Sequence, residues 1–181
     1  YQEACLYLGD AQNGSCHVVI REATEQFFNL GAFGLLDGYG SYLFSNFITS
    51  DRAYAFWQSE RNGFAHLYRY RLTENESICE GDLFDASEKE LIIQKLIRVD
   101  EREKQIYFMA NNVPECSDPM YYQLYRIGFD GSGLTRLTPE DAVHQISMGS
   151  QSFVDTYSRV DLPLVTVLRK MDGSLICELE T

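Results

Sequence analysis

The chain repeats one arrangement, two strands joined by a turn, and this repeat limits its possible folds more than any other feature. The first copy spans residues 54–72 (YAFWQSERNGFAHLYRYRL), in which Asn62-Gly63 separates an apolar segment from a segment rich in aromatic residues. Glycine adopts positive φ at little cost, so Asn-Gly is typical of tight hairpin turns. The sequence therefore predicts strands at residues 54–59 and 64–72, with residues 60–63 as the turn.

The second strand of this hairpin alternates in character. Tyr68, Tyr70 and Leu72 fall on one face of such a strand, and Arg69 and Arg71 fall on the other. Side chains of a β-strand point alternately to its two faces. We expect the aromatic face to be buried and the arginine face to be exposed to water.

The same arrangement returns twice further along the chain. Residues 105–112 (QIYFMANN) lead into 120–129 (MYYQLYRIGF), and residues 152–159 (SFVDTYSR) lead through a turn at 160–163 into 164–171 (LVTVLRKM). The copies begin roughly 50 residues apart, a period that is typical of the blades of a β-propeller, each of which is a small sheet of four strands.

Further turns and strands fill the intervals between these copies. Glycine follows asparagine or aspartate at three more places that we interpret as hairpin turns: Asn13-Gly14, Asp130-Gly131 and Asp172-Gly173. Additional strands are expected at residues 5–9, 15–22, 42–48, 77–84, 134–138, 144–148 and 174–180. Residues 85–100 are ambiguous, because a capped helix and a strand at 91–99 both fit the pattern, and the neighbouring strands favour the strand.

These elements predict an all-β protein, a partial β-propeller of about three to four blades, each a four-stranded antiparallel sheet. Residues 49–181 would contain three blades. Residues 1–48 would contain the remnant of another blade and a glycine-rich connection. The glycine-rich run at 31–40 lacks the GxGxxG spacing of a phosphate-binding loop, so we interpret it as part of that connection.

The composition excludes several classes of function. The formal net charge is −12, whereas nucleic acid binding depends on clustered lysine and arginine. No apolar run approaches the length of about 18 residues that a membrane-spanning helix needs. The five cysteines have no metal-like spacing, so we expect mainly buried free thiols, with one structural disulfide as the alternative; they are Cys5, Cys16, Cys79, Cys116 and Cys177.

Candidate catalytic and metal-binding residues are few. A hydrolase-type serine peptidase needs Gly-x-Ser-x-Gly together with a histidine base. The chain lacks this motif, and residues 131–133 (GSG) are interpreted as a hairpin loop. The three histidines, His17, His66 and His144, lie far apart on predicted strands, and a metal site would require them to converge beside a carboxylate. We therefore predict no catalytic residue, no metal site and no cofactor in this chain.

Three other residues of the first hairpin invite a functional interpretation. Trp57 is interpreted as an aromatic residue that packs between blades rather than as a platform for a ligand. Glu60 and Arg61 lie in the predicted turn and are interpreted as a solvated pair, with a contact to a partner domain or to a substrate channel as the alternative.

Three segments of the chain resemble a known family. Residues 57–68 (WQSERNGFAHLY), 124–140 (LYRIGFDGSGLTRLTPE) and 155–180 (DTYSRVDLPLVTVLRKMDGSLICELE) are similar, in this order, to the last blades of the β-propeller domain of dipeptidyl peptidase IV-like serine peptidases, in the prolyl oligopeptidase group. The resemblance covers roughly residues 47–181 and fades before them. Compared with the family, the turn at residues 149–151 is short, which leaves the register of the adjoining strands open.

The resemblance implies a role without chemistry for this chain. The whole enzyme would remove dipeptides from peptide N-termini, often with proline or alanine at the second position. The propeller would restrict access and position the peptide substrate for a C-terminal α/β-hydrolase domain outside this chain. In the family, an acidic pair upstream of the matched segments holds the substrate's free amine, so no substrate-binding residue is assigned. An extracytoplasmic location also follows from the resemblance.

Two other functions fit the same residues. The chain could be a free-standing propeller-like module that binds a protein or a carbohydrate, or a purely structural array of repeats. The sequence beyond Thr181 distinguishes them, since a hydrolase domain there favours the peptidase and a stop codon favours the others. An arc of about four blades leaves sheet faces and strand edges without neighbours, so self-association is also expected.

Overall fold

The structure is a computed structural model that describes residues 3–24, 46–73, 76–84, 90–114 and 116–180. Every helix or strand assigned in this part of the chain is a β-strand. The first two strands, β1 (Glu3–Gly9) and β2 (Cys16–Ala23), form a two-stranded sheet that we call hairpin A. Three four-stranded sheets follow, which we call blades B, C and D.

The strands of the three blades have the following bounds. Blade B comprises β3 (Asn46–Ile48), β4 (Tyr54–Ser59), β5 (His66–Leu72) and β6 (Ser77–Asp82). Blade C comprises β7 (Ile92–Asp100), β8 (Gln105–Asn111), β9 (Gln123–Gly128) and β10 (Thr135–Arg136). Blade D comprises β11 (Val143–Met148), β12 (Ser152–Arg159), β13 (Leu162–Lys170) and β14 (Leu175–Glu180).

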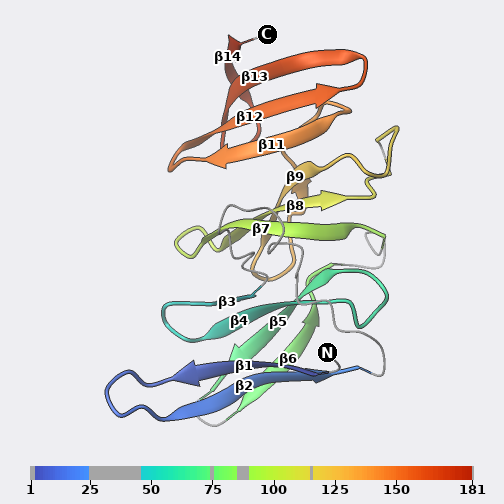
Figure 1. Ribbon diagram of the computed structural model, residues 1–181. Helices are drawn as coiled ribbons and strands as arrows, with labels where there is room; N and C mark the ends of the chain where they lie inside the picture. The colour runs from blue at the N-terminus through green and yellow to red at the C-terminus, as the bar shows by residue number, and fades with distance from the viewer. Residues whose placement is uncertain (1–2, 25–45, 74–75, 85–89, 115, 181) are drawn as a thin grey trace.

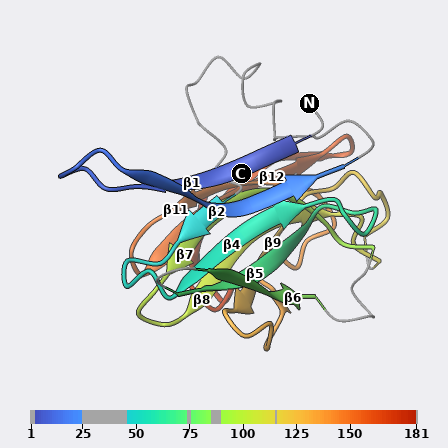
Figure 2. The same ribbon diagram turned by 90° about the horizontal axis from the view of Figure 1, so that it is seen from below.

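Each blade is an antiparallel meander whose strands pair in chain order. The sheets stack face to face, with hairpin A at one end of the stack and blade D at the other (Figure 1). Seen from the end that carries hairpin A, the sheets lie one behind another (Figure 2). The prediction of an all-β, partial β-propeller built from four-stranded antiparallel blades is confirmed.

A hydrophobic core fills each space between successive sheets. The largest core lies between blades B and C and includes Phe56, Leu67, Ile93, Ile106, Phe108 and Ile127. The core between hairpin A and blade B includes Val19, Ile20, Trp57, Tyr68 and Tyr70. The core between blades C and D is smaller and is built around Tyr107, Met109, Leu124, Leu137 and Phe153.

Blade B is covered on both faces, which corrects one expectation about the first hairpin. Tyr68 and Tyr70 pack toward hairpin A, as expected for the aromatic face. On the other face, Leu67 is buried in the core shared with blade C, and Arg69 Nη1 donates a hydrogen bond to Phe129 O at 2.8 Å. The expectation that the arginine face is exposed to water is therefore wrong for Arg69, which meets the next blade, and right for Arg71, whose side chain is 54% exposed.

One backbone hydrogen bond recurs at the same position in successive joints. Ile93, the second residue of β7, donates its backbone N–H to Ala65 O at 2.9 Å, and Ala65 directly precedes β5. His144, the second residue of β11, donates its backbone N–H to Tyr122 O at 3.2 Å, and Tyr122 directly precedes β9. The first strand of each of these blades is thus fixed to the start of the third strand of the blade before it.

A glycine in a hairpin turn closes the same two joints. Gly131 follows β9 and Gly173 follows β13, with φ values of 83° and 88°. A Cβ atom added to Gly131 would lie 2.7 Å from Leu83 O, and one added to Gly173 would lie 2.7 Å from Leu137 O. Leu83 and Leu137 each come directly after the fourth strand of the preceding blade. Both turns therefore require glycine, because φ is positive there and because the backbone of the preceding blade lies too close for a Cβ atom.

The ambiguous segment at residues 85–100 is a strand where the structure describes it. β7 runs from Ile92 to Asp100 and pairs with β8, as the strand interpretation predicts. The strand predicted at residues 134–138 is shorter than expected and comprises only Thr135–Arg136. The glycine-rich run at residues 31–40 lies outside the described residues.

Two turns of blade D differ from expectation. The turn before β13 comprises only residues 160–161, because Leu162 and Pro163 already belong to the strand. Pro163 is tolerated there because β14 pairs with β13 only from Thr166 onward, so no ladder bond needs the missing N–H. The short turn at residues 149–151 does not disturb the register, and β11 pairs with β12 without a bulge.

All five cysteines are free thiols, as predicted, but the expectation that they are buried is wrong. Cys16, Cys79 and Cys177 are exposed, and Cys5 and Cys116 are half-buried. The three exposed thiols lie on β2, β6 and β14, each of which is an edge strand of its sheet.

The cost of the close backbone approach can be measured by comparing substitutions at Gly63 and Gly173. Gly63 has a φ of 95° and open space around its Cβ position, so Gly63→Ala should destabilise by about 1–2 kcal/mol through φ alone. Gly173→Ala adds a clash with Leu137 O and should destabilise by roughly 1–3 kcal/mol more. Urea unfolding of the two variants measures both costs. Equal losses would mean that the turn after β13 is not seated on blade C.

Candidate functional site

The three histidines lie on three different sheets and do not converge. His17 is exposed on β2 of hairpin A, whereas His66 and His144 are buried in blades B and D. His66 Nδ1 lies 2.7 Å from Asp82 Oδ2, which comes from the neighbouring strand β6. Each buried histidine is therefore held by an aspartate of its own blade, and no site is built from all three.

Trp57 and Arg61 join blade B to hairpin A through one carboxylate. Trp57 is 3% exposed and its Nε1 donates to Glu22 Oε2 at 2.6 Å. Arg61 Nη2 donates to the same oxygen at 2.6 Å, and its guanidinium carbon lies 4.2 Å from the centre of the Tyr68 ring. Trp57 is thus a packing residue, as interpreted from the sequence. Glu60 and Arg61 are both exposed, as expected of a solvated pair, but Arg61 also contacts Glu22 and Tyr68 across the joint, which was not expected.

The charge on Arg61 is stabilised inside this joint. Burial by itself lowers the pKa of Arg61, but hydrogen bonds with Tyr70 and Glu22 outweigh it and raise that pKa above its usual value. Arg61 therefore acts as a fixed cation between the two sheets.

An open groove of about 460 Å³ lies beside this joint, between hairpin A and two turns of blade B. Its apolar lining includes Leu8, Val18 and Leu72, and its charged lining includes Asp51 and Arg52. Asp51 Oδ1 is already engaged within its own turn, where it accepts hydrogen bonds from Thr49 Oγ1 at 2.6 Å and Ala53 N at 2.9 Å. The groove thus offers contact surface in which the Asp51 carboxylate is already engaged.

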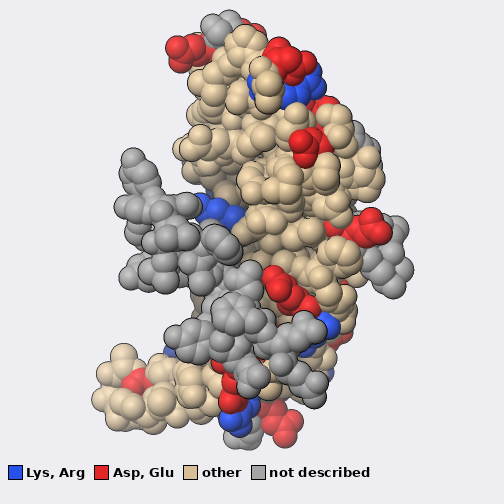
Figure 3. Space-filling view, turned by 45° about the vertical axis from the view of Figure 1, so that its right-hand side comes forward, with Lys and Arg blue, Asp and Glu red and all other residues tan. Residues whose placement is uncertain are grey.

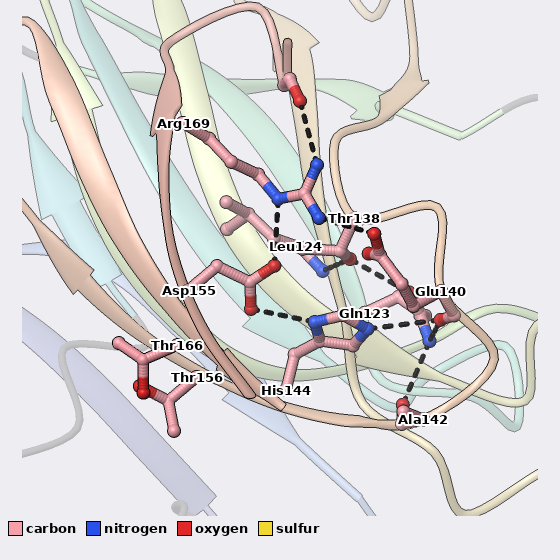
Figure 4. Close-up of polar contacts among 11 residues, drawn as sticks. Gln123, Leu124, Thr138, Glu140, Ala142, His144, Asp155, Thr156, Thr166 and Arg169 are labelled. Atoms are coloured by element: carbon pink, nitrogen blue, oxygen red, sulfur yellow. Dashed lines mark hydrogen bonds and ion pairs between the residues drawn. The ribbon is translucent and has the colours of Figure 1, made fainter. Parts of the chain in front are cut away.

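A cluster of four ionisable side chains joins blade D to blade C (Figure 4). We call it the blade D quartet: Glu140, His144, Asp155 and Arg169. Three of its members come from β11, β12 and β13, and Glu140 comes from the segment that connects β10 to β11. Arg169 pairs in register with Phe153, a member of the core between blades C and D, so the quartet lies on the face of blade D that meets blade C.

Asp155 is the centre of the quartet. Its Oδ1 lies 2.7 Å from His144 Nδ1, and its Oδ2 accepts a hydrogen bond from Arg169 Nε at 2.9 Å. Arg169 Nη2 donates to Glu140 Oε1 at 2.5 Å, and Arg169 Nη1 donates to Gly173 O at 3.2 Å. The side chains of His144 and Asp155 are fully buried, and that of Arg169 is 4% exposed.

The hydrogen bonds of the quartet place one cation between two carboxylates. Arg169 contacts both Asp155 and Glu140. The His144 ring lies between Asp155 Oδ1, 2.7 Å from Nδ1, and Glu140 O, 3.1 Å from Nε2. Burial by itself lowers the pKa of Arg169, but its hydrogen bonds to Glu140 and Asp155 outweigh burial and raise that pKa.

Glu140, His144 and Asp155 also bring potential metal ligands together, with ligand atoms within 4.8 Å of one another. Both Asp155 oxygens are nevertheless occupied, one by His144 and one by Arg169. A metal ion would have to displace the guanidinium or lie beside it, and like charges repel strongly in a buried site. The arrangement therefore fits an ion-pair network better than a metal centre.

Gln123 fixes the connecting segment that carries Glu140. Its side chain is buried, and its Nε2 donates to Glu140 O and Ala142 O, each at 3.1 Å. Its Oε1 accepts a hydrogen bond from Thr138 Oγ1 at 2.8 Å.

The sequence pattern indicated neither Asp155 nor Arg169 as a site residue. The signal that could have found them is a charged residue at an inward position of a strand whose counterparts in the other blades are apolar.

The quartet gives a prediction for stability. Arg169→Met keeps most of the side-chain volume but leaves Asp155 and Glu140 without their cation, and it should lower the free energy of unfolding by about 3–5 kcal/mol. Arg102→Met is the control, because the Arg102 side chain is 92% exposed and pairs with Glu103, whose side chain is 66% exposed, so its loss should have little effect. Urea unfolding measures both variants, and a small loss for Arg169→Met would contradict the role assigned to it.

Tyr68 gives a prediction for pH. Burial, together with the nearby Asp82 carboxylate, raises the pKa of Tyr68 from its ordinary value of 10.0 to about 12. In the window between these values the folded chain binds more protons than the unfolded chain, so the free energy of unfolding falls as pH rises from about 10 to 12. Tyr68→Phe should remove part of this fall, whereas Tyr7→Phe, at a side chain 57% exposed, should not. Urea midpoints measured at about pH 9 and 11 test this, and identical behaviour of the two variants would contradict it.

Two comparisons with known proteins give little information about the function of this chain. A search of curated proteins found no match. Among solved structures, a TolB-like protein from Agrobacterium tumefaciens matches with 15% identity and a TM-score of 0.31, over 75% of this chain and 65% of its own length. This chain thus spans less than two thirds of the length of that protein. No helix in the described part of the chain is long and apolar enough to cross a membrane.

The family match covers most of the chain. The model of the dipeptidyl peptidase IV (DPP IV) N-terminal region, a β-propeller region, matches residues 1–164. The match includes hairpin A, so the expectation that the resemblance fades before residue 47 is wrong. On this match, the chain belongs to the family of the dipeptidyl peptidase IV N-terminal region.

Proposed function

We propose that this chain is the non-catalytic propeller portion of a dipeptidyl peptidase IV-like serine exopeptidase. It restricts access of peptide substrates and positions them for an α/β-hydrolase domain that is not part of residues 1–181. The observation that carries the proposal is the family match over residues 1–164, which falls on a stack of four-stranded blades. In this proposal residues 49–181, together with β3 (Asn46–Ile48), supply three blades, and the residues before β3 supply part of a further blade and its connection.

The positions of the polar clusters support a role in positioning rather than in catalysis. Glu22 and Arg61 lie in the joint between hairpin A and blade B, and the blade D quartet lies in the joint between blades C and D. Their side chains hold sheets together instead of facing a common cleft. A peptidase also needs a nucleophile beside its histidine base, and each buried histidine here is paired with an aspartate inside its blade.

The surface charge supports a peptide partner over a nucleic acid. The formal net charge is −12. On the face drawn in Figure 3, lysine and arginine do not gather into a patch, and acidic side chains are spread among uncharged ones. A surface of negative charge attracts cationic groups such as the free amine of a peptide, and repels phosphate.

A second candidate function, a free-standing module that binds a protein or carbohydrate, is favoured by one observation. Blade D exposes large apolar side chains on β14, on β13 and in the turn before β13: Leu175, Ile176, Leu179, Leu164 and Val160. Exposed apolar surface is typical of an interface. In the favoured proposal a neighbouring part of a longer propeller, or a second copy of the chain, covers these side chains.

An activity test separates the two proposals. The protein made with the segment that follows residue 181 should cleave chromogenic Xaa-Pro dipeptide substrates, and the 181-residue chain alone should not, because the nucleophile and oxyanion site are supplied elsewhere. Deleting residues 1–181 from the longer protein should relax its selection against long peptides. A stop codon directly after residue 181, or turnover by the isolated chain that a serine-directed phosphonate blocks, would contradict the proposal.

A further inference from the structure

The pairing registers identify equivalent positions in blades C and D. Ile93 and His144 correspond, because each makes the recurring hydrogen bond to the preceding blade. Ile93 pairs with Ala110 and His144 pairs with Tyr157, so the residues two positions earlier in the second strands, Phe108 and Asp155, also correspond.

The third strands follow from the same register. Phe108 pairs with Tyr125 and Asp155 pairs with Val167. Two positions further along these strands, Ile127 therefore corresponds to Arg169. Three positions of the blade D quartet are thus the positions that Ile93, Phe108 and Ile127 occupy in blade C.

The joint between blades B and C is therefore apolar at the positions where the joint between blades C and D is charged. In the joint between blades B and C, Ile93, Phe108 and Ile127 are at most 1% exposed and belong to the largest core. In the joint between blades C and D, the corresponding space holds the ion pairs of the blade D quartet. The hydrophobic core that remains beside these ion pairs is the smaller one around Phe153.

Separation of the two joints therefore has different consequences for solvation. Opening the joint between blades B and C exposes apolar side chains to water, which is unfavourable in proportion to the area exposed. Opening the joint between blades C and D hydrates buried charges, and their favourable hydration offsets much of the Coulomb attraction that is lost. Per unit of area, the second joint costs less free energy to open.

The contacts at the edges of this joint define how blade D can move. Gln123 holds the connecting segment at Glu140 and Ala142 from the side of blade C. At the opposite end of β11, Arg98 Nη1 donates to Gly149 O at 2.7 Å. The Gln123 side chain is buried and lies beside the covalent connection, so it is placed to act as the pivot, while the half-exposed Arg98 contact can exchange with water.

We propose that the joint between blades C and D is the place at which this stack opens, with blade D moving as one unit and the blade D quartet as its latch. Local opening of this kind occurs in contiguous structural units whose free energy of opening is below that of global unfolding. The proposal concerns residues 90–180 and does not depend on the activity of any longer protein.

Hydrogen exchange of the 181-residue chain tests the proposal without any mutation. Once separated from blade C, blade D lacks the sheet that supports one of its faces, so its own ladder opens and amides of β12 and β13 should exchange at least tenfold faster than those of β8 and β9. Urea should speed this exchange with a smaller slope than that of global unfolding, because only blade D and one joint become exposed. Equal protection in the two blades, falling together as urea is added, would show that they open only by global unfolding and would overturn the proposal.

Variants of the quartet test the latch itself. The triple variant His144→Leu, Asp155→Leu, Arg169→Met replaces the buried ion pairs with apolar groups, as at the corresponding positions of blade C, and leaves only Glu140, whose side chain is 29% exposed and reaches water; it should slow exchange in blade D at least tenfold. The single variant Arg169→Met should speed exchange in blade D selectively. Ile127→Val is the matched control at the corresponding position, and it should speed exchange in blades B and C without widening the difference for blade D.

Each outcome of the variant series decides the matter. Selective slowing by the triple variant and selective speeding by Arg169→Met support the latch. If the triple variant leaves exchange in blade D unchanged, or if Arg169→Met affects all blades alike, the quartet does not control a separate opening. If the triple variant does not fold, the comparison of Arg169→Met with Ile127→Val still distinguishes these results.

Discussion

Each blade depends on the sheets next to it, because a four-stranded sheet with two apolar faces cannot bury both faces alone. Blade B shows this dependence most clearly, with Trp57 and Tyr68 packed toward hairpin A and Phe56 and Leu67 packed toward blade C. Stability is therefore a property of the joints between sheets, as in other arrays of stacked repeats. In the joints between blades B and C and between blades C and D, the recurring hydrogen bond and the close contacts of Gly131 and Gly173 set the spacing of the sheets. The side chains between the sheets determine how stable each joint is.

Turn chemistry made the strands predictable from the sequence. Asn62-Gly63 indicated a positive φ, and Gly63 has a φ of 95°. The strand at β12 was predicted with its observed bounds, Ser152–Arg159, because its pattern is local and its ends are marked by turns. The strand at β7 was favoured over a helix by its neighbours, since its own periodicity fits both structures.

The joints could not be predicted in the same way, because they depend on residues far apart in the sequence. Arg61 resembles a solvated residue of a turn until Glu22, 39 residues earlier, is placed against it. The arginine face of β5 suggested exposure to water because the period of a strand does not reveal whether a second sheet covers it. Asp155 and Arg169 are 14 residues apart, and only the pairing of β12 with β13 brings them together.

In the joints between blades B and C and between blades C and D, one backbone hydrogen bond recurs and fixes each sheet to the sheet before it. The most direct measurement is the NMR scalar coupling across that bond, from Ile93 N to the Ala65 carbonyl carbon and from His144 N to the Tyr122 carbonyl carbon. Both couplings should be detected, and the coupling at His144 should be the weaker one, because that bond is 3.2 Å rather than 2.9 Å long. Intact strands with neither coupling detectable would contradict the stacked arrangement.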